Sequence, residues 1–438
     1  MGVMTRDMME RDVTSPITTI FHTWPKIMES FAEYLEEDRR TCKDIIKTLD
    51  AGEKISAIFI TLHFGYVCTE ILNHYQVPII AISPPGLAPH FAGVFGNPDN
   101  PAYSPDLFMP VVAPLSFSER LASTLLYGLL DGRINPLLFM GMEWAGLDLF
   151  AWEKILRDRV DLLLLASHHV THFPSVLAPN TIEIGGIHCR EAQPLPSDLR
   201  QILDSHPEGV VYVSFGSSVK PSEMGEEKMK VFLETFARLS YTVIWKWDGE
   251  VMADLPSNVI LQSWVPQQDL LAHPHLKVFV THGGLLSLQE SLYHATPIVG
   301  IPLGNDQKPN MMRAERRGYA VMLDWTDLNT VDLLAAINKA ATDPDMRREM
   351  VRAHQLFVDQ PESPQARAVW WVEYVMRNKG AQFLKPSSLL LPSYQYHLLD
   401  VLLLLASAFL FIMTALFLCC CKFCNCILGR KVFKDKTE

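Results

Sequence analysis

Short apolar runs alternate with helix-length amphipathic segments through the second half of the chain. The runs are rich in valine, isoleucine and aromatic residues, which favour strands. In the segments between them, apolar residues recur at helical spacing. Strand-then-helix repetition of this kind predicts a parallel sheet covered on both faces. The pattern predicts strands at Val210–Ser214, Tyr241–Trp247, Val259–Gln262, Val278–Thr281 and Pro297–Pro302, and helices at Glu223–Arg238, Gly284–His294 and Asn305–Arg317.

The first half carries the same pattern less regularly. The runs Ile55–Thr61 and Val77–Ser83 are separated by a helix-length segment, as in a βαβ unit. Val160–Ala166 (VDLLLLA) is too short to cross a membrane and is expected to be a buried parallel strand. Gly96–Pro105 is dense in turn formers and predicts a loop, whereas Lys26–Asp50 has helical spacing.

Two α/β halves and an anchor fit the length of the chain. The sequence has 438 residues, and a polar stretch at Arg190–Pro207 separates the halves. Ligands of parallel sheets bind outside the carboxyl ends of the strands, so the residues that follow the strands are the first candidates for a site. We expect domains at residues 1–190 and 191–385, a membrane helix at 398–421 and a tail at 422–438.

An apolar segment near the C-terminus predicts a membrane helix. Val401–Cys421 contains no charged residue and is close to the ~20 residues that a helix needs to cross a bilayer. A buried core helix is the alternative, although helices of soluble proteins rarely stay apolar on every side over such a length. Positive residues after the span favour a cytosolic tail, which puts the domains in a lumen or outside the cell. These residues are Lys422, Arg430, Lys431, Lys434 and Lys436.

The tail and the cysteines add information on location. The final residues KDKTE resemble the dilysine signal for retrieval to the endoplasmic reticulum, and a solvated charged tail is the alternative. The crowded cysteines between residues 419 and 426 indicate membrane-adjacent thiols that could carry acyl chains, rather than a metal site. Cys42, Cys68 and Cys189 are widely spaced and do not indicate a disulfide framework. The charged N-terminus has no apolar region of a signal peptide.

Charge and composition exclude some classes of function. The net charge is −11, which argues against a nucleic-acid partner because phosphate binding favours a basic face. Hydrophobic residues make up 48% of the chain, a share typical of globular proteins. No GxGxxG follows an early strand, which disfavours a nucleotide-sugar epimerase.

Two predicted strand ends carry residues suited to a nucleotide. Ser214 is followed by FGSS, where glycine and small hydroxyls let the backbone approach a ligand; a simple turn is the alternative. In SWVPQQ, Trp264 beside a proline offers a flat face on which a base can stack. Gln267 offers both a donor and an acceptor for a pyrimidine edge or a ribose. The alternative for Trp264 is a core tryptophan.

The third strand end is the most informative. THGG at Thr281–Gly284 opens a helix whose unpaired N–H groups form an anion site, with His282 as a further donor to a diphosphate. Glu290 lies two turns into this helix and could accept from two ribose hydroxyls. Asp306 and Gln307 begin the next helix and could bind sugar hydroxyls. Taken singly, His282 could be a packed residue and Asp306 an N-cap.

The stretch WVPQQDLLAHPHLKVFVTHGGLLSLQESLYHATPIVGIPLGNDQKPN resembles the signature of the UDP-glycosyltransferases, the family of animal UDP-glucuronosyltransferases and their invertebrate relatives. The resemblance runs from about residue 55 to the tail. It includes GNPDNPAYSP, VVYVSFGS, DQPESPQARAVWWVEYVMR and YQYHLLDV.

The resemblance implies an α/β fold of the GT-B type, with two Rossmann-like domains and an active site in the cleft between them. The N-terminal domain would bind the acceptor and the C-terminal domain the UDP-sugar. Trp264 would stack on the uracil and Gln267 contact the uridine; Ser214 and His282 would contact the diphosphate. Glu290 would bind the ribose, and Asp306 with Gln307 the sugar. The implied UDP-sugar site is Ser214, Trp264, Gln267, His282, Gly283, Ser287, Glu290, Asp306 and Gln307.

This chain departs from the family pattern at two places. Leu286 stands where many vertebrate members have asparagine, and Ser287 directly after it could substitute in part. This departure weakens the expectation of glucuronate as the sugar, so glucose is at least as good an expectation. Family members invert the anomeric carbon with an early histidine base held by an aspartate. The sequence is expected to begin after that base, and the aspartate position falls near Thr61 or Leu62. The catalytic residue is therefore unknown, with His63 as a weak candidate and His22 as another.

Three functions stay open at this point. The first is an active, inverting transferase of glucose or glucuronate to a small lipophilic acceptor. The second is a truncated, catalytically impaired UDP-sugar-binding protein that acts with full-length enzymes, and the third is a membrane-anchored nucleotide-binding adaptor. The expected partners are UDP-glucose or UDP-glucuronate, a lipophilic acceptor, the lipid bilayer and other copies in homo- or hetero-oligomers. No cofactor beyond the UDP-sugar donor and no metal are expected, because no Asp-x-Asp cluster follows a strand.

Overall fold

The structure is a computed structural model, and it divides into two compact units, Met1–Lys385 and Pro386–Glu438. It describes residues 40–49, 54–62, 69–98, 100–105, 109–130, 149–172, 175–217, 219–249, 252, 254–304 and 306–434. The predicted helix at Lys26–Asp50 is observed at residues 40–49, and its remainder lies outside the described residues. The division of the first unit at residue 190 stays a prediction.

The first sheet has four parallel strands in the order β1-β2-β3-β4. The strands are β1 (Ile58–Thr61), β2 (Ile79–Ser83), β3 (Val160–Leu165) and β4 (Thr181–Glu183). Because β1 and β2 pair in parallel around helix α4 (Thr69–His74), the predicted βαβ unit is confirmed. Every residue of β3 is buried, as its uninterrupted apolar run predicts.

The second sheet has six parallel strands in the order β10-β9-β8-β5-β6-β7. All five predicted strands are present, with ends that shift by up to two residues, and the short edge strand β10 is an addition to them. The strands are β5 (Val210–Ser214), β6 (Thr242–Lys246), β7 (Val259–Gln262), β8 (Leu276–Thr281), β9 (Ile298–Gly300) and β10 (Ala320–Met322).

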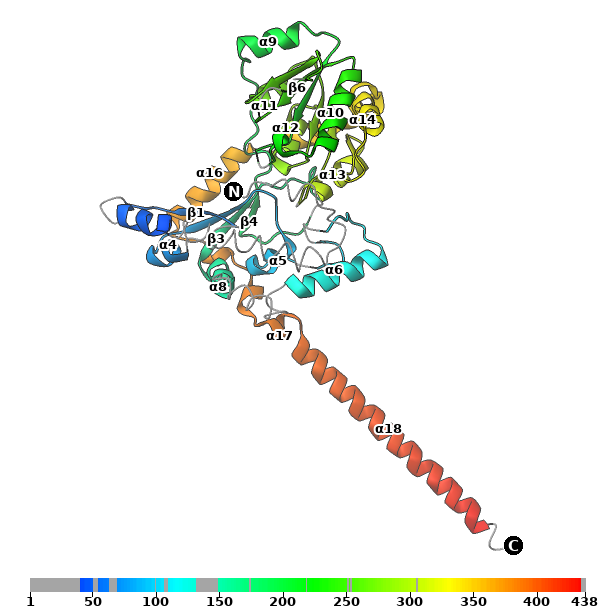
Figure 1. The fold of residues 1–438 in the computed structure, drawn as a ribbon. Helices are drawn as coiled ribbons and strands as arrows, with labels where there is room; N and C mark the ends of the chain where they lie inside the picture. Colours follow the sequence, from blue (N-terminus) through cyan, green and yellow to red (C-terminus); the bar gives the residue numbers. More distant parts are fainter. Residues whose placement is uncertain are drawn as a thin grey trace. The chain divides into compact units, whose positions relative to one another are not determined.

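Helices cover both faces of the second sheet (Figure 1). Alternate residues of β5 divide between two cores: Val211 and Val213 pack with the helices α10 (Glu226–Arg238) and α14 (Thr330–Thr342). Val210 and Tyr212 pack with α9 (Ser197–Asp204) and α11 (Gln267–Leu271) on the opposite face. A third core joins α12 (Leu285–Tyr293), α13 (Gln307–Arg316) and α15 (Pro344–Val358).

The chain returns to the first sheet after it has completed the second. Helix α16 (Pro364–Arg377) buries Ala368 and Val375 against strands β2 and β3. The buried Asp161 carboxylate then accepts hydrogen bonds from the backbone N–H of Ile79 at 3.3 Å and of Ala381 at 2.8 Å. The other helical elements of this unit are α5 (Pro89–Ala92), η3 (Gly93–Phe95), α6 (Phe117–Leu130), α8 (Leu149–Arg159), η4 (Pro221–Glu223) and η5 (Gln382–Leu384).

One expectation on the cysteines is wrong. Cys42 is disulfide-bonded, although wide spacing gave no indication of a disulfide. Sequence spacing alone cannot reveal such a bond, because the fold brings distant residues together. Cys189 is buried and free, and burial raises the pKa of its thiol, so it is a structural rather than a reactive cysteine.

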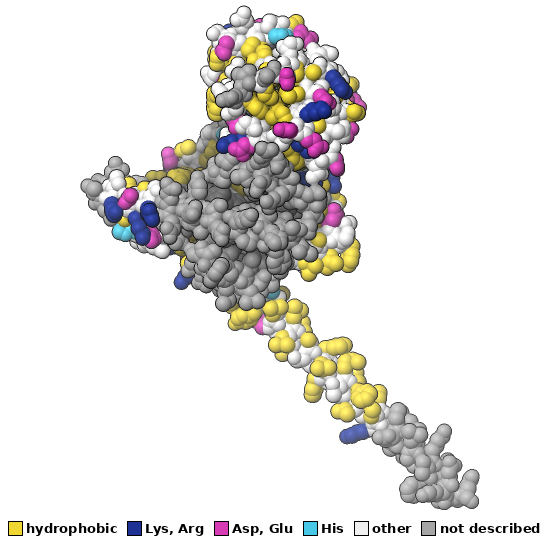
Figure 2. Space-filling view, in the orientation of Figure 1, with side chains coloured by type: hydrophobic (Ala, Val, Ile, Leu, Met, Phe, Trp, Pro, Cys, Tyr) yellow, Lys and Arg dark blue, Asp and Glu magenta, His cyan; other side chains and the backbone are white. Residues whose placement is uncertain are grey.

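The second unit contains the long apolar helix that the sequence predicts. Its elements are η6 (Ser387–Leu390), α17 (Ser393–Tyr396) and α18 (Leu399–Lys434). Within α18, Leu399–Lys422 is long and apolar enough to cross a membrane, with a mean hydropathy of 2.8. Figure 2 shows apolar side chains along this helix with almost no charge between them. The observed segment agrees with the span expected at residues 398–421.

Candidate functional site

The polar strand ends of the second sheet lie next to one another. Strand β5 lies between β8 and β6, and Ser214 at its end pairs with Thr281 at the end of β8. The loops that follow these ends also touch, because a side chain on Gly216 would come within 2.9 Å of the His282 ring. The two motifs that the sequence singled out separately therefore form one surface.

The two glycines before helix α12 let His282 lie against the helix start. Gly283 has a φ of 85°, which glycine adopts without strain. A side chain on Gly284 would approach the His282 Nε2 atom to 2.7 Å. Burial, with a contribution from the nearby Lys246 cation, lowers the pKa of His282 to about 4. The ring is therefore neutral at pH 7 and can donate a hydrogen bond to an anion beside the unpaired N–H groups of the helix.

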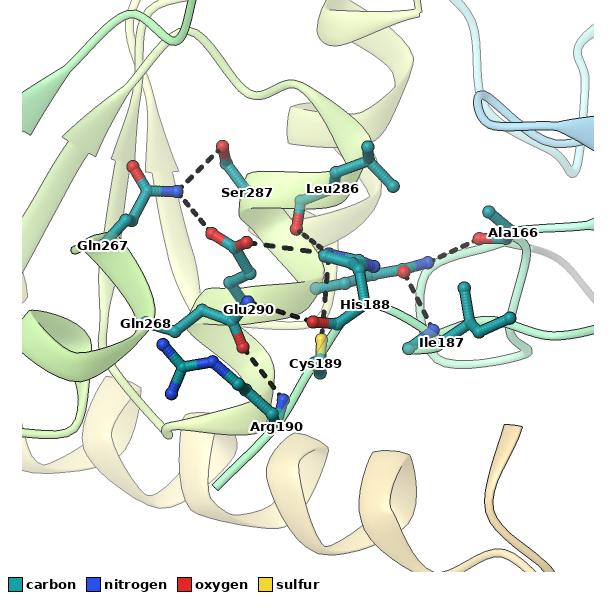
Figure 3. Close-up of polar contacts among 12 residues, drawn as sticks. Ala166, Ile187, His188, Cys189, Arg190, Gln267, Gln268, Leu286, Ser287 and Glu290 are labelled. Carbon is teal, nitrogen blue, oxygen red and sulfur yellow. Dashed lines mark hydrogen bonds and ion pairs between the residues drawn. The ribbon is translucent and has the colours of Figure 1, made fainter. Parts of the chain in front are cut away.

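Gln267, Ser287 and Glu290 form a connected group (Figure 3). The Gln267 Nε2 atom donates to Ser287 Oγ at 3.1 Å and forms a short hydrogen bond with Glu290 Oε2. The Gln267 Oε1 atom accepts from the buried Tyr212 hydroxyl at 3.2 Å. The Glu290 side chain keeps 15% of its surface exposed. Gln267 therefore holds the carboxylate in place, while part of Glu290 stays open to a ligand.

Trp264 lies on the surface rather than in the core. Its side chain is 71% exposed, which excludes the alternative of a core tryptophan. The Lys246 Nζ atom lies 5.2 Å from the centroid of the indole and donates to the Gly216 carbonyl at 3.1 Å. An exposed aromatic face next to a cation suits a base and its attached phosphates.

Asp306 and Gln307 begin helix α13, as predicted. Asp306 makes no side-chain cap hydrogen bond and instead accepts from Asn310 Nδ2 at 2.7 Å. The same Asn310 amide donates to the Gly283 carbonyl at 3.2 Å, which ties α13 to the turn that precedes α12. Burial raises the pKa of Asp306. Gln307 Oε1 accepts from the backbone N–H groups of Leu303 and Gly304, so its amide nitrogen is the group that could donate to a ligand.

Sequence reasoning missed three residues of this surface. Lys246 ends the strand β6, and a cation at a predicted strand end was the signal that could have identified it. Neither Asn310 nor His188 follows a predicted strand end, and their contacts with Gly283 and Leu286 join segments that are distant in sequence. His188 lies 3.0 Å from the Leu286 carbonyl and 3.9 Å from the Glu290 carboxylate.

The catalytic residue is not identified. His22 and His63 lie outside the described residues. Thr61 ends β1, and Leu62 after it is fully buried; neither side chain can act as a carboxylate partner of a base. Within the described part of the chain, no group of three histidine, cysteine, aspartate or glutamate side chains could hold a metal ion.

Comparisons with known proteins show the family of the chain. The chain is 31% identical to the UDP-glycosyltransferase UGT5 of Dactylopius coccus over 402 residues, which span 90% of this chain and 76% of that protein. It is also 31% identical to human UDP-glucuronosyltransferase 2B7 over 447 residues, 97% of this chain and 81% of that protein.

Solved structures support the fold. A UDP-glucosyltransferase from Polygonum tinctorium superposes with a TM-score of 0.56 at 17% identity, over 80% of this chain and 82% of that one. The calicheamicin glycosyltransferase CalG4 gives a TM-score of 0.52 at 17% identity, over 79% and 81%. These neighbours confirm the expected GT-B architecture. The model of the family "UDP-glucoronosyl and UDP-glucosyl transferase" matches residues 4–434, and this chain belongs to that family.

Proposed function

We propose that this chain binds a UDP-sugar across the strand ends of the second sheet and transfers glucose or glucuronate to a small lipophilic acceptor with inversion. The observation that carries the proposal is the exposed indole of Trp264, which follows strand β7 as His282 follows β8, both at the carboxyl ends of parallel strands of one sheet. Glu290 lies in helix α12, which begins just after His282. The names of the relatives, which include glucosyl- and glucuronosyltransferases, support the same reaction class.

Each part of UDP has a matching group at this edge. Uracil stacks on the Trp264 indole, and the ribose hydroxyls donate to Glu290. The diphosphate accepts hydrogen bonds from the start of helix α12 and from the neutral His282 ring. Ser214 contributes from a buried position at the end of β5, where its hydroxyl accepts from the Gly216 backbone N–H at 3.3 Å, and Lys246 adds a positive charge. A divalent cation is then unnecessary for charge neutralisation, because helix dipole, N–H groups and lysine share that role.

The sugar, which is attached to the diphosphate, lies at the start of helix α13. Asp306 and Gln307 offer an acceptor and a donor to its hydroxyls, and Asn310 fixes the Asp306 carboxylate. Leu286 is 42% exposed on the first turn of α12 and offers no hydrogen bond to a carboxylate. This apolar neighbour suits glucose at least as well as glucuronate, since a sugar carboxylate gains most from a donor or cation.

The acceptor hydroxyl needs a base in this reaction. Inversion requires a base that reaches the acceptor hydroxyl at roughly 2.6–3.2 Å, on the sugar face opposite the leaving UDP. His63 stays the candidate from the sequence. The acceptor is expected to bind to the first half of the chain, as in the family pattern.

We propose that the protein lies in the membrane of the endoplasmic reticulum, with lumenal domains and a cytosolic tail. Lys422 and the basic residues after it favour a cytosolic tail, and KDKTE supports retrieval to this compartment. The disulfide at Cys42 supports the same orientation, because disulfides form in oxidising compartments such as this lumen.

A second candidate function is UDP-sugar binding without turnover, alone or in association with other transferase chains. Thr61 and Leu62, at the position where the family pattern expects an aspartate, favour it because neither can ionise to support a base.

The experiment that separates these functions uses the full chain in detergent micelles. Binding of UDP, UDP-glucose and UDP-glucuronate is measured by calorimetry, and transfer of labelled sugar to a panel of phenols is measured in parallel. Donor binding with sugar transfer supports the transferase. Donor binding without transfer favours the second candidate, and failure to bind any UDP compound contradicts both.

A further inference from the structure

The segment that links the two sheets is fastened directly to the candidate nucleotide site. The Arg190 backbone N–H donates to Gln268 Oε1 at 2.9 Å, and Gln268 Nε2 donates back to the His188 carbonyl at 3.0 Å. Arg190 also forms two hydrogen bonds with the buried Asp269 carboxylate, at 2.6 and 2.9 Å. Both partners belong to helix α11, whose first residue, Gln267, binds Glu290. The backbone around His188 therefore has a fixed position beside that carboxylate.

The contacts of the His188 ring define which nitrogen carries a proton. Its Nε2 atom lies 3.0 Å from the Leu286 carbonyl oxygen. A carbonyl can only accept, so Nε2 carries the hydrogen. The same Nε2 atom lies 3.9 Å from Glu290 Oε1, and the Nδ1 atom is buried without a hydrogen-bond partner. Figure 3 shows the ring between Leu286 and Glu290.

The Glu290 carboxylate is thus approached from two sides. Gln267 donates to its Oε2 atom, and the N–H end of the His188 ring faces its Oε1 atom at 3.9 Å. That distance is too long for a hydrogen bond. The ring therefore acts on the carboxylate through its bulk and through the partial positive charge of its N–H group. Two neighbouring ribose hydroxyls need both carboxylate oxygens at one orientation. A carboxylate that is held only at Oε2 could rotate out of that orientation.

We propose that His188 is a positioning residue that sets the rotation of the Glu290 carboxylate for the two ribose hydroxyls. This inference rests on the proposed function, because it assumes that Glu290 binds the ribose of UDP. His188 itself does not touch the nucleotide in this scheme. Its contribution should therefore appear in the discrimination between ribose and deoxyribose, and should leave uracil stacking and diphosphate binding unchanged.

The test compares UDP with 2′-deoxy-UDP by calorimetry on the full chain in detergent. The wild type should bind UDP more tightly, and Glu290→Ala should abolish that preference. His188→Ala should reduce the preference by about fivefold, the upper end for a partly exposed charge contact, with the affinity for 2′-deoxy-UDP unchanged. His188→Gln should restore most of it, because a glutamine amide can donate from the place of Nε2. His188→Ala should have no further effect in a Glu290→Ala background.

His354→Ala is the matched control. The His354 ring also contacts a carbonyl of helix α12, Leu292, at 3.0 Å, but at the other end of the helix from Leu286. It should leave the preference for UDP unchanged. The inference is overturned if His188→Ala weakens UDP and 2′-deoxy-UDP equally, or if His188→Gln behaves like His188→Ala while both variants unfold at the wild-type temperature. A wild type without preference, or a Glu290→Ala variant that keeps it, would instead contradict the ribose assignment in the proposed function.

Discussion

Removal of the Trp264 indole should weaken UDP binding strongly and leave the fold intact. The side chain is 71% exposed, so truncation to alanine leaves no core cavity. Stacking of one base on an aromatic side chain contributes roughly 1–3 kcal/mol. Because 1.4 kcal/mol corresponds to about a tenfold change, Trp264→Ala should raise the Kd for UDP by about 5- to 150-fold. The loss of the Lys246 contact adds at most a further ~1 kcal/mol, since the lysine lies 5.2 Å from the ring centroid.

The assay is calorimetric titration of UDP into wild type and variant, with thermal unfolding measured on the same samples. Trp370→Ala is the matched control, because this indole is also partly exposed, at 49%, and stacks on Tyr374 away from the candidate site. The control should bind UDP like the wild type. Trp264→Phe should recover part of the affinity, since a smaller ring still stacks. An unchanged Kd in Trp264→Ala, with the fold retained, would refute the reasoning.

Four further predictions concern other parts of the molecule. His282→Ala should raise the Kd for UDP by about tenfold, and because burial lowers the pKa of His282 to about 4, the wild-type affinity should show no step from this ring between pH 6 and 8; calorimetry at several pH values checks both. Asp306→Ala should leave the Kd for UDP within about twofold and lower kcat/KM for sugar transfer at least tenfold, since the carboxylate is assigned to the sugar; titration of UDP alongside transfer kinetics separates the two effects. Burial lowers the pKa of His168 and of His172 to about 3, whereas the ordinary value is 6.5. Below pH 6.5 the unfolded chain therefore binds more protons than the folded one, and the free energy of unfolding should fall as the pH drops from about 6.5 towards 3. In denaturant titrations, a His168→Gln/His172→Gln variant should show a smaller fall. Gln289→Leu should lower the free energy of unfolding by about 1–3 kcal/mol in denaturant titrations, because the buried amide donates to the Ala166 carbonyl and accepts from the Gly186 N–H at 3.0 Å. Gln289→Glu should not recover the wild-type stability, because a carboxylate cannot donate to the Ala166 carbonyl.

Periodicity predicted the second sheet well because its strands are buried on both faces. Such strands are continuous apolar runs, as in Val210–Ser214, whose observed ends match the prediction. The short edge strands β4 and β10 escaped prediction, because three residues are too few to establish a period. Their strand conformation comes from pairing with β3 and β9.

Some residues of the candidate site could be predicted from the sequence and others could not. Residues after strand ends, such as His282 and Asp306, could be identified because the topology of a parallel sheet places them at one edge. The role that we propose for His188 could not be predicted, since it depends on a contact with Leu286 across nearly a hundred positions of sequence. The close approach of the His282 ring to Gly284 could not be predicted either. A glycine pair indicates a turn, but the sequence does not show which side chain packs against it.

The central claim is that UDP lies across the strand ends of the second sheet, with its base on Trp264 and its ribose at Glu290. A crystal or cryo-electron microscopy structure of the full chain with UDP tests it most directly. The account predicts the uracil ring parallel to the Trp264 indole, the ribose hydroxyls on the Glu290 carboxylate and the diphosphate at the start of helix α12. A nucleotide bound elsewhere, with the indole uncovered, would contradict it.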